Sequence, residues 1–323
     1  MPARLRLRSF AKINLDLRVL NKRPDGYHEL RTIFQTISLA DTIDIEYHPG
    51  RSRVDIKSNL NIPDNLIVRA ADSVMKAIGR TGRLGFVLQK RIPLGGGLGG
   101  GSSNAAAVLL ALPFLLQRPL PIEKLMELGA GLGSDVPFFL LGGAALGLGR
   151  GTELYPLPDI PAQPALLIAP GIHVSTKEAY ARLGRKLTTG SPAPTIGSFQ
   201  PDDFQSVAWQ MANASPGGDW GSVNDFESVV FRLHPQLKSI KGKLLRLGAR
   251  PALMSGSGSS LFGIFPSRQL RDRAVESFRK EFAKDKVYSV TMVSRARYRT
   301  LWRRQLAAPM DSKVWPPQDR YAK

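Results

Sequence analysis

Cysteine is absent from the 323-residue chain. Its absence excludes disulfide bonds, thiolate metal sites and cysteine nucleophiles, and it fits a reducing compartment, so we predict a cytoplasmic location. Histidine is scarce as well, and no two of the four histidines have the spacing of a metal site. They are His28, His48, His173 and His234.

Long apolar runs are also missing. The first eight residues alternate arginine with leucine after Met-Pro-Ala, without the apolar segment of a signal peptide. The longest apolar stretches, residues 105–116 and 136–149, are too short or too rich in glycine to span a bilayer. We therefore predict a soluble protein without a membrane partner.

Acidic residues are few relative to basic ones. The chain has 45 Lys and Arg against 26 Asp and Glu, which gives a formal charge of +19. Such a charge suits either nucleic acid or an anionic small substrate. The basic residues are spread along the chain and are not interleaved with a row of stacking aromatics, as single-strand binders require. We predict no nucleic-acid partner, and a basic nucleic-acid-binding protein remains the alternative.

Glycine, in contrast, is concentrated in one segment. Residues 91–106 read Arg-Ile-Pro-Leu-Gly-Gly-Gly-Leu-Gly-Gly-Gly-Ser-Ser-Asn-Ala-Ala and lead into an apolar helix-forming segment. Glycine allows positive φ and close approach of the backbone to a ligand. A helix that begins there points its free N–H groups at that ligand. We predict a phosphate-binding loop, in which Ser102, Ser103 and Asn104 cap the helix or add donors.

Three well-known glycine motifs do not fit this loop. The P-loop requires a lysine after its last glycine, and Gly101 is followed by Ser102. A dinucleotide fold requires an acidic residue about 20 residues on, where the chain has Pro119-Leu120-Pro121. The His-Arg-Asp and Asp-Phe-Gly motifs of protein kinases are missing too.

The alternation of apolar and polar residues predicts an α+β chain of two domains. Strands are expected at residues 4–20, 30–39, 42–47, 54–58, 85–90, in a glycine-rich pair at 142–151 and 152–157, and at 250–254, 261–265 and 287–293. Helices are expected at 66–78, in the apolar run from 105 onward, at 122–128, in a short helix capped by Ser134 or Asp135, and at 176–183, 203–212, 226–233, 235–247 and 268–284. Four prolines between 156 and 164 mark the boundary. The predicted domains are 1–158, which holds the glycine loop, and 159–300, followed by an unassigned basic tail, 301–323.

Three segments resemble the motifs of the GHMP small-molecule kinases: 11–15, the loop 93–103, and Ser255-Gly-Ser-Gly-Ser. Within that superfamily, the segments 25–30, 133–139 and 224–227 resemble one branch, and the resemblance extends from about residue 10 to 293. The branch phosphorylates the 2-hydroxyl of 4-diphosphocytidyl-2-C-methyl-D-erythritol in the non-mevalonate pathway to isoprenoid precursors. The resemblance implies a two-domain α+β fold with a ribosomal-protein-like N-terminal domain and a ferredoxin-like C-terminal domain.

The resemblance also assigns catalytic residues. It implies that Asp135 takes the proton of the attacking hydroxyl and that Lys12 lies beside it as its charge partner. Taken singly, Asp135 could equally be a helix N-cap and Lys12 half of a surface salt bridge. ATP and Mg²⁺ are the implied cofactors, with Ser102 or Ser103 as possible metal contacts and no ligand assigned.

Further residues follow from the same resemblance. Asn14 contacts the substrate, Tyr27 stacks on its cytosine and His28 reads the edge of that ring. Tyr180 aligns with an aromatic position on the opposite face of the cytosine, and Thr176 is a further substrate-binding residue. Asn65 and Leu66 lie where the family holds adenine. The phosphate-binding residues are Pro93, Leu94, Gly95, Gly96, Gly97, Leu98, Gly99, Gly100, Gly101, Ser102 and Ser103.

A second enzymatic reading is another GHMP kinase that acts on mevalonate, homoserine or a sugar. The Gly26-Tyr27-His28 element argues against it, because those relatives have no cytosine to stack. We expect a monomer or a weak homodimer whose partner is the small-molecule substrate.

Overall fold

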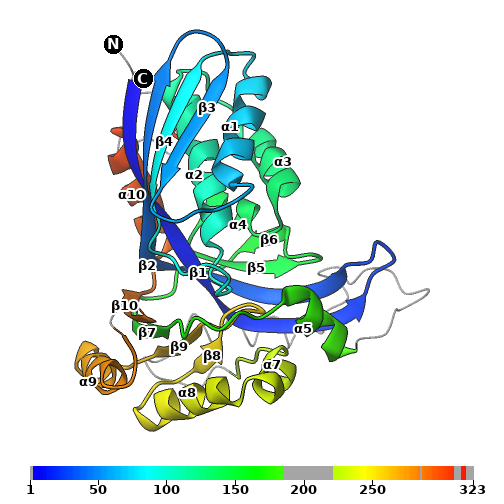
Figure 1. The fold of residues 1–323 in the computed structure, drawn as a ribbon, viewed down its shortest axis with the longest axis vertical. Helices are drawn as coiled ribbons and strands as arrows, with labels where there is room; N and C mark the ends of the chain where they lie inside the picture. Colours follow the sequence, from blue (N-terminus) through cyan, green and yellow to red (C-terminus); the bar gives the residue numbers. More distant parts are fainter. Residues whose placement is uncertain (1–2, 185–220, 284–285, 309–313, 318–323) are drawn as a thin grey trace.

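The computed structural model describes residues 3–184, 221–283, 286–308 and 314–317. The chain forms two bodies along its long axis, each built on its own sheet (Figure 1). The predicted α+β class is confirmed. The helix expected at 203–212 lies outside the described residues. No helix in the described part is long and apolar enough to cross a membrane.

A long antiparallel hairpin joins the two bodies. It consists of β1 (Ala3–Lys22) and β2 (His28–His48), and Figure 1 shows it running from the upper body to the edge of the lower one. The sequence predicted two strands where β2 is one. The polar residue Asp41 does not interrupt β2, because it pairs with Ser9 in the ladder and its carboxylate has buried hydrogen-bond donors.

The upper body is a six-stranded sheet with helices on one face (Figure 1). The hairpin is extended by β3 (Arg53–Ser58), β4 (Arg83–Gln89), β5 (Ala144–Leu148) and β6 (Glu153–Pro156). The helices are α1 (Leu66–Ala77), α2 (Gly100–Leu115), α3 (Ile122–Leu132) and α4 (Val136–Leu141). Residues 103–114 of α2 are all buried, so a helix that is apolar on every side can be stable there. The glycine loop leads into this central helix.

The lower body is a four-stranded antiparallel sheet of order β10-β7-β9-β8. Its strands are β7 (Pro164–Ile168), β8 (Ala252–Met254), β9 (Leu261–Ile264) and β10 (Val287–Thr291). Its helices are α5 (Thr176–Leu183), α7 (Glu227–Leu233), α8 (Pro235–Arg246) and α9 (Arg268–Arg279). A shared apolar cluster, with Ile13 and Leu15 of β1 against Phe262 and Ile264 of β9, joins the two sheets. The bodies therefore meet along the hairpin.

The last helix, α10 (Arg295–Leu306), returns to the upper body. Its buried side chains Tyr298, Trp302 and Leu306 belong to the upper core. The Tyr298 hydroxyl donates to the Phe139 carbonyl oxygen at 2.5 Å. The helix thus crosses residue 300, the predicted end of the second domain.

Trp315, in the tail to which the sequence assigned no role, is docked on the upper body. Its indole Nε1 donates to the carbonyl oxygen of Leu140 at 2.8 Å. Its ring lies 6.4 Å from that of Tyr298 and 5.2 Å from the guanidinium of Arg299. The tail therefore contributes an anchor to the core beside α4.

Trp315→Ala should lower the free energy of unfolding by about 2 kcal/mol, because it removes a half-buried ring and a hydrogen bond. Thermal melting should show a decrease of several degrees in Tm. Trp315→Phe, which keeps a ring and loses the donor, should cost less. Equal Tm values for all three proteins would show that the docked tail adds no stability.

Candidate active site

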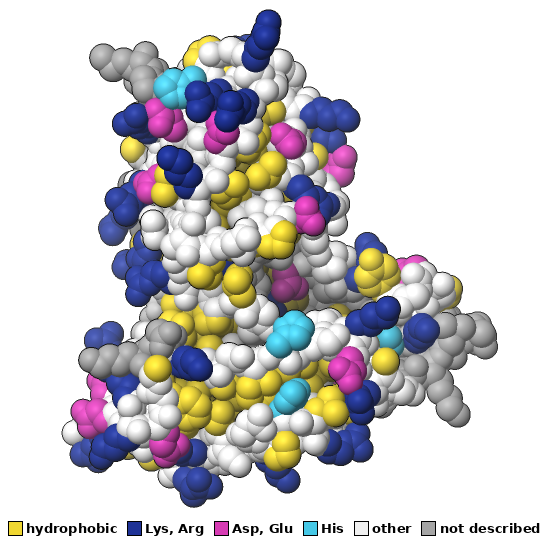
Figure 2. Space-filling view, in the orientation of Figure 1, with side chains coloured by type: hydrophobic (Ala, Val, Ile, Leu, Met, Phe, Trp, Pro, Cys, Tyr) yellow, Lys and Arg dark blue, Asp and Glu magenta, His cyan; other side chains and the backbone are white. Residues whose placement is uncertain are grey.

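A cavity of about 820 Å³ lies between the hairpin, the glycine loop, α4 and α5. Figure 2 shows the molecule hollowed between its upper and lower bodies. Residues that are far apart in the sequence meet in this cavity. Of the predicted site residues, it is lined by Lys12, Asn14, Tyr27, His28, Gly97, Gly99, Asp135, Thr176 and Tyr180.

The glycine loop reverses direction through left-handed backbone conformations. Gly95, Gly97 and Gly99 have φ values of +67°, +75° and +66°, which favour glycine. Helix α2 begins at Gly100, and no side chain caps it. The predicted capping by the serines is therefore wrong, and the hydroxyl of Ser103 instead donates to the Phe10 carbonyl oxygen at 2.6 Å. The N–H groups of the first helical turn, unsatisfied in any α-helix, are left for a ligand.

The second glycine run packs against this loop backbone to backbone. A Cβ atom on Gly258 would lie 2.5 Å from the nitrogen of Gly97, and one on Gly97 would lie 2.0 Å from the oxygen of Ser255. The Ser255 hydroxyl also donates to the Gly97 carbonyl oxygen at 3.0 Å. The Asn224 side-chain amide fixes this second run by donating hydrogen bonds to the Met254 and Gly256 carbonyl oxygens. The lower body thus supports the loop of the upper one.

Lys12 and Asp135, which both line the cavity, form an ion pair. The Lys12 Nζ lies 3.4 Å from the Asp135 Oδ2, and the two side chains are 4% and 32% exposed. Asp135 precedes α4, but its carboxylate makes no capping bond. Both simpler interpretations, a helix cap and a surface salt bridge, are therefore wrong.

Neighbouring groups fix this lysine in place. Its Nζ donates to the Asn14 Oδ1 at 2.7 Å, and the Asn14 Nδ2 donates to the Thr32 hydroxyl at 2.7 Å. Its backbone N–H donates to the Leu98 carbonyl oxygen at 3.1 Å, where the pairing of β1 with β2 shifts register. The backbone bond connects β1 to the glycine loop, and the side-chain bonds within the hairpin direct the ammonium group of Lys12 toward Asn14, beside Asp135.

Aromatic rings line the other end of the cavity. His28 and Tyr180 stack with centroids 4.6 Å apart, and Phe226 meets Tyr180 edge-on at 4.8 Å. Burial and the nearby charge of Lys22 lower the pKa of His28, so the ring is neutral near pH 7. Burial, and to a smaller extent the charge of Asp135, raise the pKa of Tyr180 to about 12. These neutral groups can stack on a base and bond its edge.

Several cavity residues have no counterpart in the sequence prediction. The guanidinium of Arg150 lies 4.6 Å from the centre of the Tyr27 ring, and Tyr27 is 53% exposed. The Thr176 hydroxyl bonds to that of Ser257 at 2.8 Å. Phe226 lies in the segment 224–227, which resembles the branch, but the resemblance assigned no role to this residue. Arg150 follows a glycine turn, where no sequence signal marks it.

The remaining predicted nucleotide contacts lie outside this cavity. Asn65 caps α1, because its Oδ1 accepts from the Ile67 N–H at 3.0 Å. Leu66 lies beside the first turn of α2, 3.7 Å from a Cβ built on Gly101. The Leu94 side chain is 55% exposed, whereas Leu98 is buried. Contact of Asn65 and Leu66 with adenine stays a prediction.

Comparison with known proteins places these features in a family. The chain matches the GHMP kinases N terminal domain over residues 65–143 and the GHMP kinases C terminal domain over 210–284. It is 55% identical over 316 residues to a protein of Solibacter usitatus named 4-diphosphocytidyl-2-C-methyl-D-erythritol kinase, covering 98% of this chain and 97% of the relative. A Geobacter protein of the same name is 41% identical, covering 86% and 95%.

Solved structures agree. The crystal structure of a 4-(cytidine 5'-diphospho)-2C-methyl-D-erythritol kinase matches with a TM-score of 0.74 and 37% identity, covering 89% of this chain and 99% of that one. A homoserine kinase from Cytophaga hutchinsonii matches with a TM-score of 0.66 at 20% identity, covering 90% and 95%. The second match shows a shared fold alone.

Proposed function

Because the chain belongs to the GHMP kinases, and among them to the 4-diphosphocytidyl-2-C-methyl-D-erythritol kinases, we propose that Asp135 is its catalytic base and Lys12 the charge partner. The chain is an ATP-dependent kinase of isoprenoid biosynthesis. The observation that carries the residue assignment is the Lys12–Asp135 pair, set between the glycine loop and the aromatic end of one cavity.

Phosphoryl transfer requires little covalent help from a protein, so the residues mainly position groups and stabilise charge. Asp135 accepts the proton of the 2-hydroxyl as the oxygen attacks the terminal phosphate of ATP. The ammonium group of Lys12 balances the charge of the carboxylate and the charge on the phosphoryl group during its transfer. Its bond to Asn14 holds it in that place.

The glycine loop holds the phosphates of ATP. The uncapped start of α2 supplies N–H donors and the positive end of the helix dipole. Glycine at positions 95, 97 and 99 lets the backbone turn around the phosphates. Support from the second glycine run keeps the loop in one conformation before ATP binds.

Mg²⁺ fits this site as a companion of ATP. Among the described residues there is no group of three His, Asp or Glu side chains that could hold a metal alone, and Mg²⁺ commonly uses substrate phosphates, waters and one or two protein oxygens. The Ser103 hydroxyl is bonded to the Phe10 carbonyl oxygen, which leaves Ser102 as the loop serine that could contribute an oxygen. The ion would neutralise charge on the phosphates.

The acceptor is recognised by its cytosine. By the family resemblance, Tyr27 stacks on one face of the base, Tyr180 lies on the other, and the neutral His28 bonds its edge. The His28 ring lies against Tyr180 in this structure, so the base takes its place on that ring. The cations Lys22, Arg150 and Lys177 line the same cavity and balance the two phosphates of the cytidine diphosphate group.

Release of ADP with a panel of acceptors tests the assignment. We expect turnover with 4-diphosphocytidyl-2-C-methyl-D-erythritol and none with mevalonate, homoserine or a sugar. Filter binding to RNA over a salt series tests the nucleic-acid alternative, because binding through phosphates weakens steeply with salt. Turnover of another acceptor at a similar kcat/KM would contradict the assignment.

Tyr27→Ala and His28→Ala should raise KM for the diphosphocytidyl acceptor and leave KM for ATP nearly unchanged. Loss of a stacking partner costs about 1–3 kcal/mol per base, which corresponds to roughly 5- to 150-fold in KM. Steady-state kinetics with each substrate varied in turn measure both constants. A rise in KM for ATP alone would place these rings at the adenine instead.

A further inference from the structure

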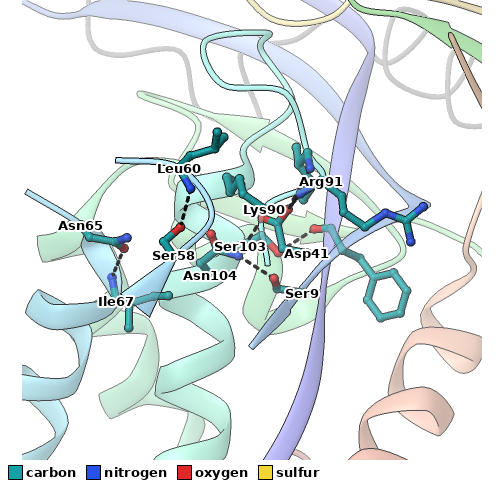
Figure 3. Close-up of polar contacts among 12 residues, drawn as sticks. Ser9, Asp41, Ser58, Leu60, Asn65, Ile67, Lys90, Arg91, Ser103 and Asn104 are labelled. Atoms are coloured by element: carbon teal, nitrogen blue, oxygen red, sulfur yellow. Dashed lines mark hydrogen bonds and ion pairs between the residues drawn. The ribbon is translucent and has the colours of Figure 1, made fainter. Parts of the chain in front are cut away.

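The carboxylate of Asp41, in the middle of β2, lies outside the cavity and is fully buried. Its Oδ1 accepts hydrogen bonds from the backbone N–H groups of Arg91 at 2.7 Å and Ile92 at 2.8 Å. Its Oδ2 accepts from the Asn104 Nδ2 at 2.9 Å and from the Lys90 ammonium group. Figure 3 shows Lys90, Arg91 and Asn104 around the Asp41 side chain.

The donors come from the two sides of the glycine loop. Arg91 and Ile92 lie between the end of β4 and the loop, and Asn104 lies in the second turn of α2, after it. A single carboxylate thus holds both ends of the segment that binds phosphate. We propose that Asp41 is a positioning residue for ATP, which acts by fixing the entry and exit of the glycine loop. This inference rests on the assignment of that loop to ATP.

Lys90 adds a second connection. Its Nζ would lie 2.5 Å from a Cβ built on Gly100, so the ammonium group packs against the first residue of α2. Asn59 fixes its backbone, accepting from the Lys90 N–H at 2.7 Å and donating to the Lys90 carbonyl oxygen at 3.2 Å. The paired charges offset one another, which leaves the helix dipole available to the phosphates.

The remaining contact completes the network. The Asn104 Nδ2 also donates to the Ser9 hydroxyl at 2.6 Å, and Ser9 faces Asp41 across the β1–β2 ladder. Asn104 is 2% exposed. Its amide therefore has no water to replace a lost partner, and a change at Asp41 acts directly on the start of α2.

Asp41→Asn keeps an acceptor for Arg91 and Ile92 but turns an amide N–H₂ group toward two donors, Lys90 and Asn104. It also leaves Lys90 as an unbalanced buried charge. We expect ADP binding, measured by calorimetry, to weaken about 10- to 100-fold, the effect of one lost charged hydrogen bond. KM for the acceptor should change far less than ADP affinity, because the residues assigned to its cytosine, Tyr27, His28 and Tyr180, lie at the other end of the cavity and do not touch Asp41.

The double variant Asp41→Asn/Lys90→Met separates positioning from charge. It removes both charges, and the Asn104 amide can then flip to accept from the new amide while Ser9 donates to it. ADP affinity should recover to within a few-fold of wild type. Failure to recover in a folded double variant would contradict the proposal, because a neutral network with its hydrogen bonds restored would then not hold the loop in its binding conformation.

Asn104→Ala provides a test that does not disturb the ion pair, should Asp41→Asn fail to fold. It removes only the hydrogen bonds of the Asn104 side chain in α2. ADP affinity should therefore fall, and KM for the acceptor should stay unchanged. Normal ADP affinity with a lowered Tm in the single variants would mean a purely structural role and would overturn the proposal. If the wild-type protein binds no ADP, the assignment of the loop is at fault instead.

Discussion

Asp135→Asn should lower kcat by about 10²- to 10⁴-fold, the range for loss of a general base, and leave ADP affinity within a few-fold of wild type. The amide has nearly the same shape as the carboxylate and cannot take the hydroxyl proton. Because the Asp135 side chain makes no capping bond, α4 should form as before. Single-turnover kinetics with saturating substrates isolate the chemical step.

Two further variants complete this test. Asp72→Asn makes the same change on the exposed side of α1 and should leave kcat unaltered. Lys12→Met should also be severely impaired, since it removes the charge partner and the donor to Asn14. Near-normal turnover of a folded Asp135→Asn protein would show that Asp135 is not the catalytic base.

Gly101→Val should abolish measurable ATP binding while the protein still folds. Gly101 is exposed in the first turn of α2, and its Cβ would meet only Leu66, at 3.7 Å. A branched side chain there covers N–H groups that we assign to the phosphates. Loss of two charged hydrogen bonds, about 3 kcal/mol or more, corresponds to at least about 100-fold in affinity, measured by calorimetry with ADP.

Gly131→Val is the matched control. Gly131 is an exposed glycine in α3, and a Cβ built on it meets no atom within 4 Å. The same change in helix propensity therefore occurs away from the loop, and both proteins should have similar Tm values. If Gly101→Val binds ADP as tightly as Gly131→Val does, the phosphates lie elsewhere.

Gly99 shows why the choice of glycine required the structure. The repeated glycines indicate a loop, but they do not tell which sides of it face a ligand. A Cβ at Gly99 would lie 2.8 Å from the Phe139 ring and 3.2 Å from the Lys12 Cγ. A valine there would disturb the core and displace the lysine, so its effect would not isolate ATP binding.

The sequence by itself determined the features that depend only on residues close together in the chain. Glycines followed by an apolar run specify a loop and a helix, because backbone freedom and helix propensity belong to neighbouring residues. The three glycine and lysine segments indicated the GHMP family, to which the chain belongs. Local rules failed where tertiary contacts compete with them, as for Ser103, whose hydroxyl bonds to β1 and leaves α2 uncapped.

Only the tertiary structure decided which distant groups meet. The Lys12–Asp135 pair forms because the hairpin and α4 enclose one cavity. Nothing local in the sequence marks Asp41, since a lone aspartate between two apolar runs looks like a strand break. Its burial, with four donors converging on one carboxylate, exists only once β2, β4 and α2 have packed. Spacing along the chain predicts the loop, and three-dimensional packing decides what holds it.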